Sequence, residues 1–194
     1  MLAVVRQEVA RREARALDGR APHAGDGGKS MTYVMGLDLG NCYSYASTVE
    51  GMDERRSGGT ELTLVDPEFG SQVGVPSRFF YDGGVSGDPL VCRELGWHGI
   101  YETAGVGMLK RHINESFEMG GRTFAYSKAV TRVAQHVVRM ANERLLEQRQ
   151  ATTRLVSLAY PATFSSDDRR ALVCAVEGAT LEDGRHVEVV GTIM

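Results

Sequence analysis

The sequence predicts an α/β fold in which a three-stranded antiparallel meander is followed by a helix–strand–helix–strand succession. Two observations support this prediction. Short β-rich runs with turn signals between them occupy residues 33–65. In the second half the pattern becomes regular, and apolar residues fall at the three-and-four spacing of a buried helix in residues 129–146. The segment between these parts, with its short strands and turns, is predicted to form a small inserted subdomain.

The meander is predicted from the runs YVMGLDL (33–39), CYSYASTV (42–49) and ELTLV (61–65). In the inserted part, VPSRFFYDGG and the region 85–91 are expected to give short strands or loops, and a short helix is expected to end near Lys110. FEMGGRTFAYS is typical of a hairpin with Gly120 and Gly121 at its turn.

The regular half begins with the helix over 129–146, for which Ser127 is a plausible cap. RLVSLAY (154–160) reads as a buried strand that Pro161 ends, and SSDDRR opens a second helix capped by Ser165 or Ser166. That helix is expected to end near Gly178, before a last strand over 186–194. The first helix should bury one apolar stripe: Val130, Val133, Ala134, Val137, Val138, Ala141 and Leu145.

Composition excludes several classes of partner. The 194 residues carry a formal net charge of -3, which gives no basic footprint for nucleic acid or for an anionic membrane. The 3 cysteines are far apart and form no C-x-x-C pair, so a reducing compartment is expected rather than a disulfide framework or a zinc site. The 5 histidines show no metal-ligand spacing.

Residues 1–30 differ in composition from the rest and form a charged stretch followed by a Gly/Pro-rich linker. Because this part contains neither an uninterrupted apolar signal core nor a spanning segment, the protein is expected to be soluble and cytoplasmic. Met31 lies directly before the first strand and is interpreted as the functional start. The domain is therefore expected to occupy residues 31–194.

Two neighbouring stretches have the composition of a phosphate loop. GDGGKS (25–30) lacks the first glycine of a P-loop, follows a linker instead of a strand, and precedes a strand instead of a helix, so it is interpreted as linker. GLDLGNCYS (36–44) predicts a strand ending at Asp38, a tight turn at Gly40, and a second strand. Its backbone N–H groups from Gly40 to Tyr43 would form an anion-binding concavity, and Asp38 would hold a hydrated magnesium ion.

GLDLGNCYSYASTVE resembles the opening phosphate-binding hairpin of the seventy-kilodalton heat-shock chaperones (DnaK type), which belong to the actin-like ATPase superfamily. LVSLAYPATFSSDDRRAL is similar to a second family motif, and VPSRFF, GDP and MLKRHINESF are similar to three further segments. The similar segments occur in the family's order. They imply a ribonuclease H-like lobe, binding of ATP and magnesium, and, in the complete protein, ATP hydrolysis coupled to the folding of unfolded polypeptide clients with co-chaperones.

The resemblance also assigns roles to individual residues. It implies that Asp38 lies near magnesium, that Gly40, Asn41, Cys42 and Tyr43 wrap the phosphates, and that Lys110 is the catalytic lysine that reaches the γ-phosphate. The same resemblance makes Pro161 and Arg169 a pair that relays nucleotide state to the substrate-binding part. The residues alone favour other interpretations: Lys110 as a surface cation in a KRH run, Pro161 as a strand terminator, and Arg169 as a surface charge.

The sequence departs from the family where two threonines usually follow Gly40, because Asn41 and Cys42 stand there. The chain also stops at Met194, before the family's next metal-binding segment, so we expect about the first half of the ATPase domain, inactive by itself and prone to self-association through an exposed surface. The alternatives are a non-catalytic nucleotide-binding or interaction module, and a fragment of an actin-like sugar or acetate kinase.

Overall fold

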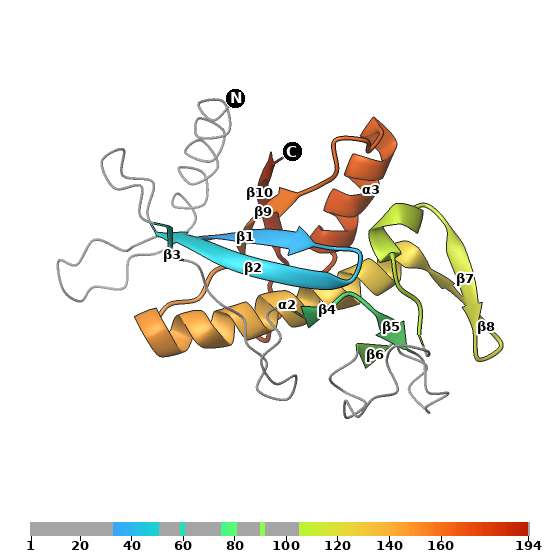
Figure 1. Cartoon of the computed structure of the whole chain (residues 1–194). Helices are drawn as coiled ribbons and strands as arrows, with labels where there is room; N and C mark the ends of the chain where they lie inside the picture. Colours follow the sequence, from blue (N-terminus) through green and yellow to red (C-terminus); the bar gives the residue numbers. More distant parts are fainter. Residues whose placement is uncertain (1–32, 51–58, 61–74, 81–89, 92–104, 194) are drawn as a thin grey trace.

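The computed structural model describes residues 33–50, 59–60, 75–80, 90–91 and 105–193 (Figure 1). The predicted N-terminal tail, the GDGGKS stretch, the start at Met31, the strand over 61–65 and the GDP turn at 87–89 lie outside these residues.

A mixed sheet forms the centre of the described structure. Strand β1 (Tyr33–Leu39) pairs antiparallel with β2 (Tyr43–Glu50) and parallel with β9 (Leu155–Ala159), and β9 pairs parallel with β10 (Glu188–Ile193). The order of the long strands is therefore β10-β9-β1-β2. The prediction of an α/β fold is confirmed at this level.

Two short strands extend the sheet along β2. Both β3 (Gly59–Thr60) and β4 (Val75–Pro76) pair antiparallel with it, at opposite ends of the strand. The first two strands of the predicted meander are confirmed, and β3 supplies an antiparallel third strand just before the stretch predicted for it.

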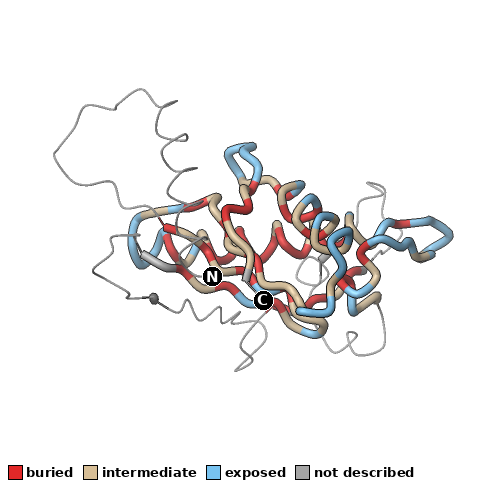
Figure 2. The backbone as a smooth tube through the Cα atoms, turned by 90° about the horizontal axis from the view of Figure 1, so that it is seen from above, coloured by how far each residue is buried: buried red, intermediate tan, exposed pale blue. Residues whose placement is uncertain are grey.

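Helix α2 (Tyr126–Arg149) supplies the largest part of the core. All residues of its predicted stripe are buried. All of them except Leu145 join buried residues of β1, β9 and the second long helix in one cluster, and Leu145 packs with Tyr33 in a second cluster. In Figure 2 the buried positions lie on these central strands and helices, whereas the tip of the hairpin is exposed. None of the described helices is long and apolar enough to cross a membrane.

The start of α2 differs from the prediction, because Ser127 is not its cap. Ala125 is the N-cap residue and makes no side-chain cap hydrogen bond. Ser127 already lies in the first turn, where its carbonyl accepts a hydrogen bond from Thr131 Oγ1. The backbone N–H of Tyr126 donates instead to the carbonyl of Glu115, which satisfies one of the free groups of this helix end.

Helix α3 (Ser166–Glu177) begins as the sequence predicts, and of the two candidate serines Ser165 is the cap. Its hydroxyl accepts a hydrogen bond from the N–H of Asp168, and the Asp168 carboxylate accepts one from the N–H of Ser165. This is a reciprocal capping box with aspartate in the place usually taken by glutamate.

The inserted part contains β5 (Phe79–Phe80), β6 (Leu90–Val91), the 3-10 helix η3 (Leu109–His112), β7 (Ser116–Met119) and β8 (Arg122–Ala125). The predicted hairpin is confirmed as β7–β8, with Gly120 and Gly121 at φ 58° and 75°. Positive φ at both turn residues is what a type I′ turn requires. The rings of Phe79, Phe117 and Phe124 pack together and join this part to the main core.

Only one face of the sheet is deeply buried among the described residues. Along β1, Met35, Leu37 and Leu39 are buried, whereas the alternate residue Asp38 is exposed. Since successive side chains of a strand point to opposite faces, Asp38 lies on the face opposite that core.

Candidate functional site

The carboxyl ends of three parallel strands meet at one edge of the sheet. Asp38 near the end of β1 is paired in register with Ala159 at the end of β9, and Ala159 with Ile193 of β10. The β1–β2 loop and the turn after β9 therefore leave the sheet at the same edge, which is where ligands bind in open α/β sheets.

Gly40 begins the β1–β2 loop, and its lack of a side chain is required by space. A Cβ atom at this position would lie 2.1 Å from the carbonyl oxygen of Tyr43. Ser77 also holds this loop in place. Its N–H donates a hydrogen bond of 2.8 Å to the carbonyl of Cys42. Its hydroxyl lies 2.8 Å from the hydroxyl of Ser44, and both serines are buried. Sequence reasoning assigned Ser77 no role, although the VPS in VPSRFF was the available signal.

The residues that follow Gly40 have three different environments. The Oδ1 atom of Asn41 is buried and makes no hydrogen bond to any described residue. Cys42 carries an exposed free thiol, and Tyr43 is half-buried at the start of β2. An amide oxygen buried without a donor is costly, so the Asn41 side chain is a destabilising feature of this loop.

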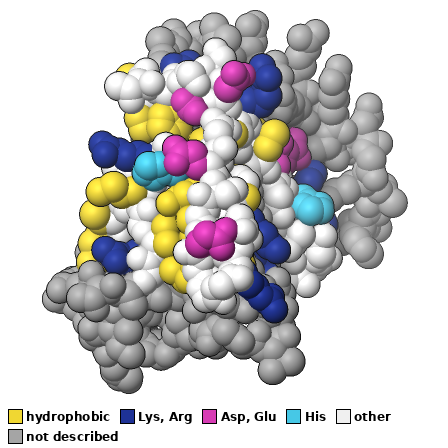
Figure 3. Space-filling view, turned by 90° about the vertical axis from the view of Figure 1, so that its right-hand side faces the viewer, with side chains coloured by type: hydrophobic (Ala, Val, Ile, Leu, Met, Phe, Trp, Pro, Cys, Tyr) yellow, Lys and Arg dark blue, Asp and Glu magenta, His cyan; other side chains and the backbone are white. Residues whose placement is uncertain are grey.

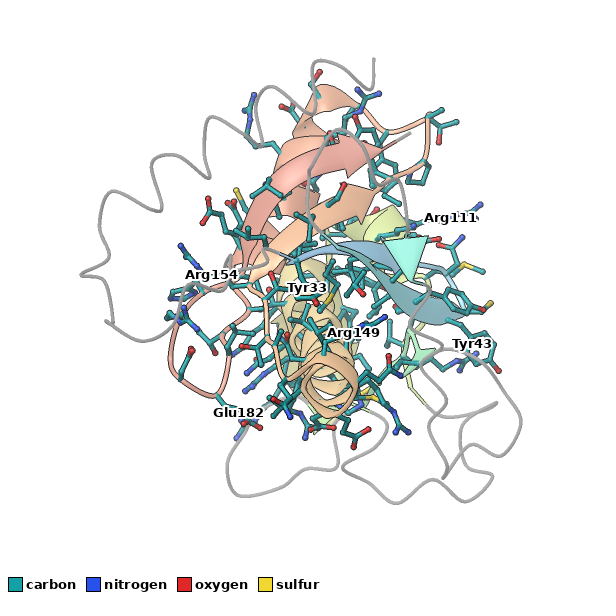
Figure 4. The ribbon with its side chains drawn as sticks, turned by 90° about the vertical axis from the view of Figure 1, so that its left-hand side faces the viewer. Tyr33, Tyr43, Arg111, Arg149, Arg154 and Glu182 are labelled. Atoms are coloured by element: carbon teal, nitrogen blue, oxygen red, sulfur yellow. The ribbon has the colours of Figure 1, made fainter. Side chains whose placement is uncertain are left out.

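Lys110 lies against Asp38, although the two residues are 72 positions apart in the sequence. Its Nζ is 3.4 Å from Asp38 Oδ1, with side-chain exposures of 9% for the lysine and 55% for the aspartate. The interpretation of Lys110 as a surface cation is therefore wrong. The next residue, Arg111, is the exposed cation of this run and points outward in Figure 4.

The backbone before Lys110 was not anticipated. Met108, the N-cap of η3, is 48% exposed and has φ 54° and ψ 33°, in the left-handed region that residues other than glycine seldom adopt. The helix η3 begins directly after Met108, and its residues Leu109 and Lys110 are buried. Strained backbone of this kind is typical of functional sites.

The donor set at this edge suits a magnesium ion that keeps most of its water. Asp38 offers one largely accessible carboxylate, and no group of three or more His, Cys, Asp or Glu residues is assembled in the described parts of the chain. Mg²⁺ typically binds through one or two carboxylates together with phosphate oxygens and waters. Asp38 would hold the ion and Lys110 would face the accompanying phosphate charge.

Arg169 lies in the first turn of α3 and contacts the turn that follows β9. Its Nε donates to the carbonyl of Phe164 over 3.1 Å, and its guanidinium lies 4.8 Å from the centre of the Tyr160 ring. The carbonyl of Pro161 accepts a hydrogen bond from the N–H of Phe164. Arg169 therefore holds both ends of the turn that contains Pro161, and it is more than a surface charge.

The predicted residues thus fall into two groups on one sheet edge. Asp38, Lys110 and the loop from Gly40 to Tyr43 form the first, which we call the loop cluster. Pro161 and Arg169 belong to the second, at the turn that follows β9. On the face in Figure 3, basic and acidic side chains are interspersed and form no patch of one sign.

Comparison of the sequence with protein-family models and with curated proteins gives no match.

Proposed function

We propose that this chain is the N-terminal lobe of a DnaK-type chaperone ATPase, and that its loop cluster binds the phosphates of ATP together with magnesium. The observation that carries the proposal is the contact between Lys110 and Asp38 beside the Gly40 turn. A lysine buried at a sheet edge, with an accessible carboxylate as its partner, supplies one cation for phosphate and one ligand for the metal.

The strand arrangement supports the same proposal. A ribonuclease H-like lobe has an antiparallel meander whose first strand also pairs in parallel with the strands that follow, and β1 pairs in this way with β2 and β9. In the proposed fold, the Gly40 loop takes the phosphate groups and the turn at Pro161 transmits nucleotide state through Arg169. The partners of the complete protein would be unfolded polypeptides and co-chaperones.

Each group has a defined part in binding. The backbone N–H groups of the loop donate to phosphate oxygens, and the close approach permitted by Gly40 brings them within reach. When ATP is absent, Lys110 is partly neutralised by Asp38. Asp38 would hold the hydrated magnesium ion that accompanies the nucleotide, and Lys110 would supply positive charge to its phosphates.

Binding of the magnesium–ATP complex, followed by equilibrium dialysis or ³¹P NMR titration, tests the proposal. Lys110→Met and Asp38→Asn each remove one charge of the cluster and should weaken binding at least about tenfold, which corresponds to about 1.4 kcal/mol. Arg111→Met and Asp167→Asn remove the same charges from exposed positions and are the matched controls. Equal effects in both pairs, or no saturable binding by the unmodified chain, would contradict the proposal.

A further inference from the structure

One hydrogen bond joins the segment that follows η3 to the first turn of α3. The Nδ2 atom of Asn114 donates over 2.7 Å to Oδ1 of Asp168, although the two residues are 54 positions apart. Asn114 comes four positions after Lys110, and Asp168 directly precedes Arg169. The bond therefore connects the segment that carries the lysine of the loop cluster with the helix that carries the arginine of the Pro161 turn.

The backbone between Lys110 and Asn114 is helical. Ile113, the residue that follows η3, has φ -52° and ψ -31°. Its side chain is buried in the main core together with that of Leu109. Because a helical segment of this length moves as a unit, its orientation at Asn114 also sets the orientation of Lys110.

The contact at Asn114 is the shorter of the two side-chain contacts that this segment makes with distant residues. The Nζ of Lys110 lies 3.4 Å from Asp38 Oδ1, beyond the distance of about 2.7–2.9 Å that is usual for a charge-assisted hydrogen bond. The bond from Asn114 lies within that range. On the other side of the segment, Met108 keeps its unfavourable left-handed backbone. The segment is therefore held more closely at Asn114 than at the lysine itself.

Asp168 is a fixed acceptor because the capping box of α3 already holds it. Its Oδ2 accepts hydrogen bonds from the N–H and from the hydroxyl of Ser165, so Oδ1 is the atom that receives Asn114. The hydrogen bonds of Ser165, and with them that of Asn114, lower the pKa of Asp168, so the acceptor is charged near neutral pH. A hydrogen bond to a charged acceptor is stronger than one between neutral groups.

From these observations we infer that Asn114 is a positioning residue, which through its bond to Asp168 holds the η3 segment so that Lys110 faces the phosphates. The inference rests on the proposed function, because it assigns the residue that orients Lys110 in that same site. The bond also connects the loop cluster to α3, whose Arg169 holds the Pro161 turn.

Variants that break and then restore the bond test this role. Asn114→Ala removes the donor, and Asn114→Asp places a second carboxylate against Asp168. Addition of Asp168→Asn to Asn114→Asp exchanges donor and acceptor, so that the bond forms again at the same net charge. Gln148→Glu makes the same change from amide to carboxylate at an exposed position of α2 and is the matched control.

NMR spectra of the chain labelled with ¹³C at lysine Cε report on Lys110 in the absence of any ligand. The sequence contains Lys29, Lys110 and Lys128, so the spectrum is simple, and Lys110→Met assigns the signal. Both single variants of Asn114 should shift the Lys110 signal, and the exchanged pair should return it to its position in the unmodified chain. Gln148→Glu should leave the signal in place.

Binding of the magnesium–ATP complex is the second measurement. Because exposed polar pairs contribute little free energy, Asn114→Ala and Asn114→Asp should weaken binding by only about twofold to fivefold, and the exchanged pair should restore it. In a Lys110→Met background, Asn114→Ala should have no further effect, because Asn114 acts through the lysine. A contribution of Asn114 to stability alone would persist in that background.

The outcomes separate this inference from the function on which it rests. If the unmodified chain shows no saturable binding, the proposed function fails, and the role of Asn114 in phosphate binding fails with it. If the chain binds nucleotide but the Lys110 signal is unchanged in both Asn114 variants, the inference is overturned and the proposed function stands. Failure of the exchanged pair to restore signal and binding, or an equal loss of binding in the Lys110→Met background, would also overturn it.

Discussion

At the scale of single residues, Gly40 is the position at which the candidate site depends most directly on covalent geometry. Gly40→Ala places a methyl group 2.1 Å from the Tyr43 carbonyl, so the loop must move. We expect a loss of about 1–3 kcal/mol in the free energy of unfolding and loss of phosphate binding. Urea denaturation and nucleotide titration measure the two effects.

Gly107→Ala is the matched control for this change. The nearest atom to an added Cβ there is Arg78 Cγ at 3.9 Å, an ordinary contact. This variant should keep its stability within about 0.5 kcal/mol. If the two variants lost equal stability and binding, a steric clash at Gly40 would not be the reason that this position requires glycine.

The same scale shows why the sequence predicted some site residues better than others. Asp38 and Gly40 belong to a local strand–turn–strand pattern, so their neighbourhood is set by residues close in sequence. Lys110 could not be distinguished from Arg111 in the KRH run, because its burial follows from the left-handed backbone at Met108 and from contact with a strand 72 positions away. The resemblance, and not local chemistry, distinguished Lys110 from Arg111.

At the scale of elements, we expect the buried stripe of α2 to supply most of the packing energy of this helix. Leu145 and Leu146 are adjacent leucines, 1% and 54% exposed respectively. Leu145→Ala should cost about 2–5 kcal/mol because it leaves a cavity in the core. Leu146→Ala should change stability by no more than about 0.5 kcal/mol. Chemical denaturation of the two variants checks this, and equal losses would contradict the assigned face of the helix.

Helix α3 gives a pH-dependent prediction through its capping box. Hydrogen bonds from the Ser165 side chain and backbone lower the pKa of Asp168 from its ordinary value of 3.8. A carboxyl group whose pKa is lower in the folded state stabilises the fold above its unfolded pKa, and the contribution is lost as the pH falls toward the folded value. Stability should therefore decline as the pH is lowered from about 5 to 3.

Asp168→Asn should reduce this decline, as urea midpoints at several pH values would show. Asp167→Asn alters the neighbouring carboxylate of the same turn, whose ion pair is with the exposed Arg170, and should leave the decline as it is in the unmodified chain. An unchanged decline in Asp168→Asn would show that other acidic groups dominate.

The elements also show the limits of sequence patterns. The stripe of α2 and a serine cap of α3 were predictable because both depend on residues within a few positions of one another. The start of α2 was not predictable in this way, because the N–H of Tyr126 donates to the carbonyl of Glu115, on the other side of the β7–β8 hairpin, and needs no serine cap. Figure 4 views α2 from its C-terminal end, where Arg149 is its last residue.

At the scale of the whole molecule, the sequence order of strands predicted the meander but not all neighbours in the sheet. Parallel pairing of β1 with β9 brings together residues more than a hundred positions apart. The Thr153 hydroxyl donates a hydrogen bond to the Tyr33 carbonyl and stabilises this pairing. Hydrophobic runs alone do not specify which strand takes this place. The helix–strand–helix–strand order becomes informative only with the rule that parallel strands need a crossover connection.

The arrangement of the sheet leads to a prediction about assembly. Within the described sheet, β10 pairs with β9 and is the edge strand on that side of the sheet. Its pairing with β9 has a register shift between Val189 and Gly191. Such irregularities reduce edge-to-edge pairing, but Thr192 and Ile193 beyond the shift are again paired in register with β9. We therefore expect self-association that increases with concentration through the C-terminal part of this edge.

Sedimentation velocity over a wide concentration range would measure this association. Thr192→Lys places a charge on the edge and should shift the protein toward monomer, since lysine on an edge strand opposes pairing with another chain. Thr152→Lys adds the same charge at an exposed position between α2 and β9 and should leave association unchanged. A monomer at every concentration would exclude the β10 edge as an interface, and an equal response to both lysines would assign the effect to net charge.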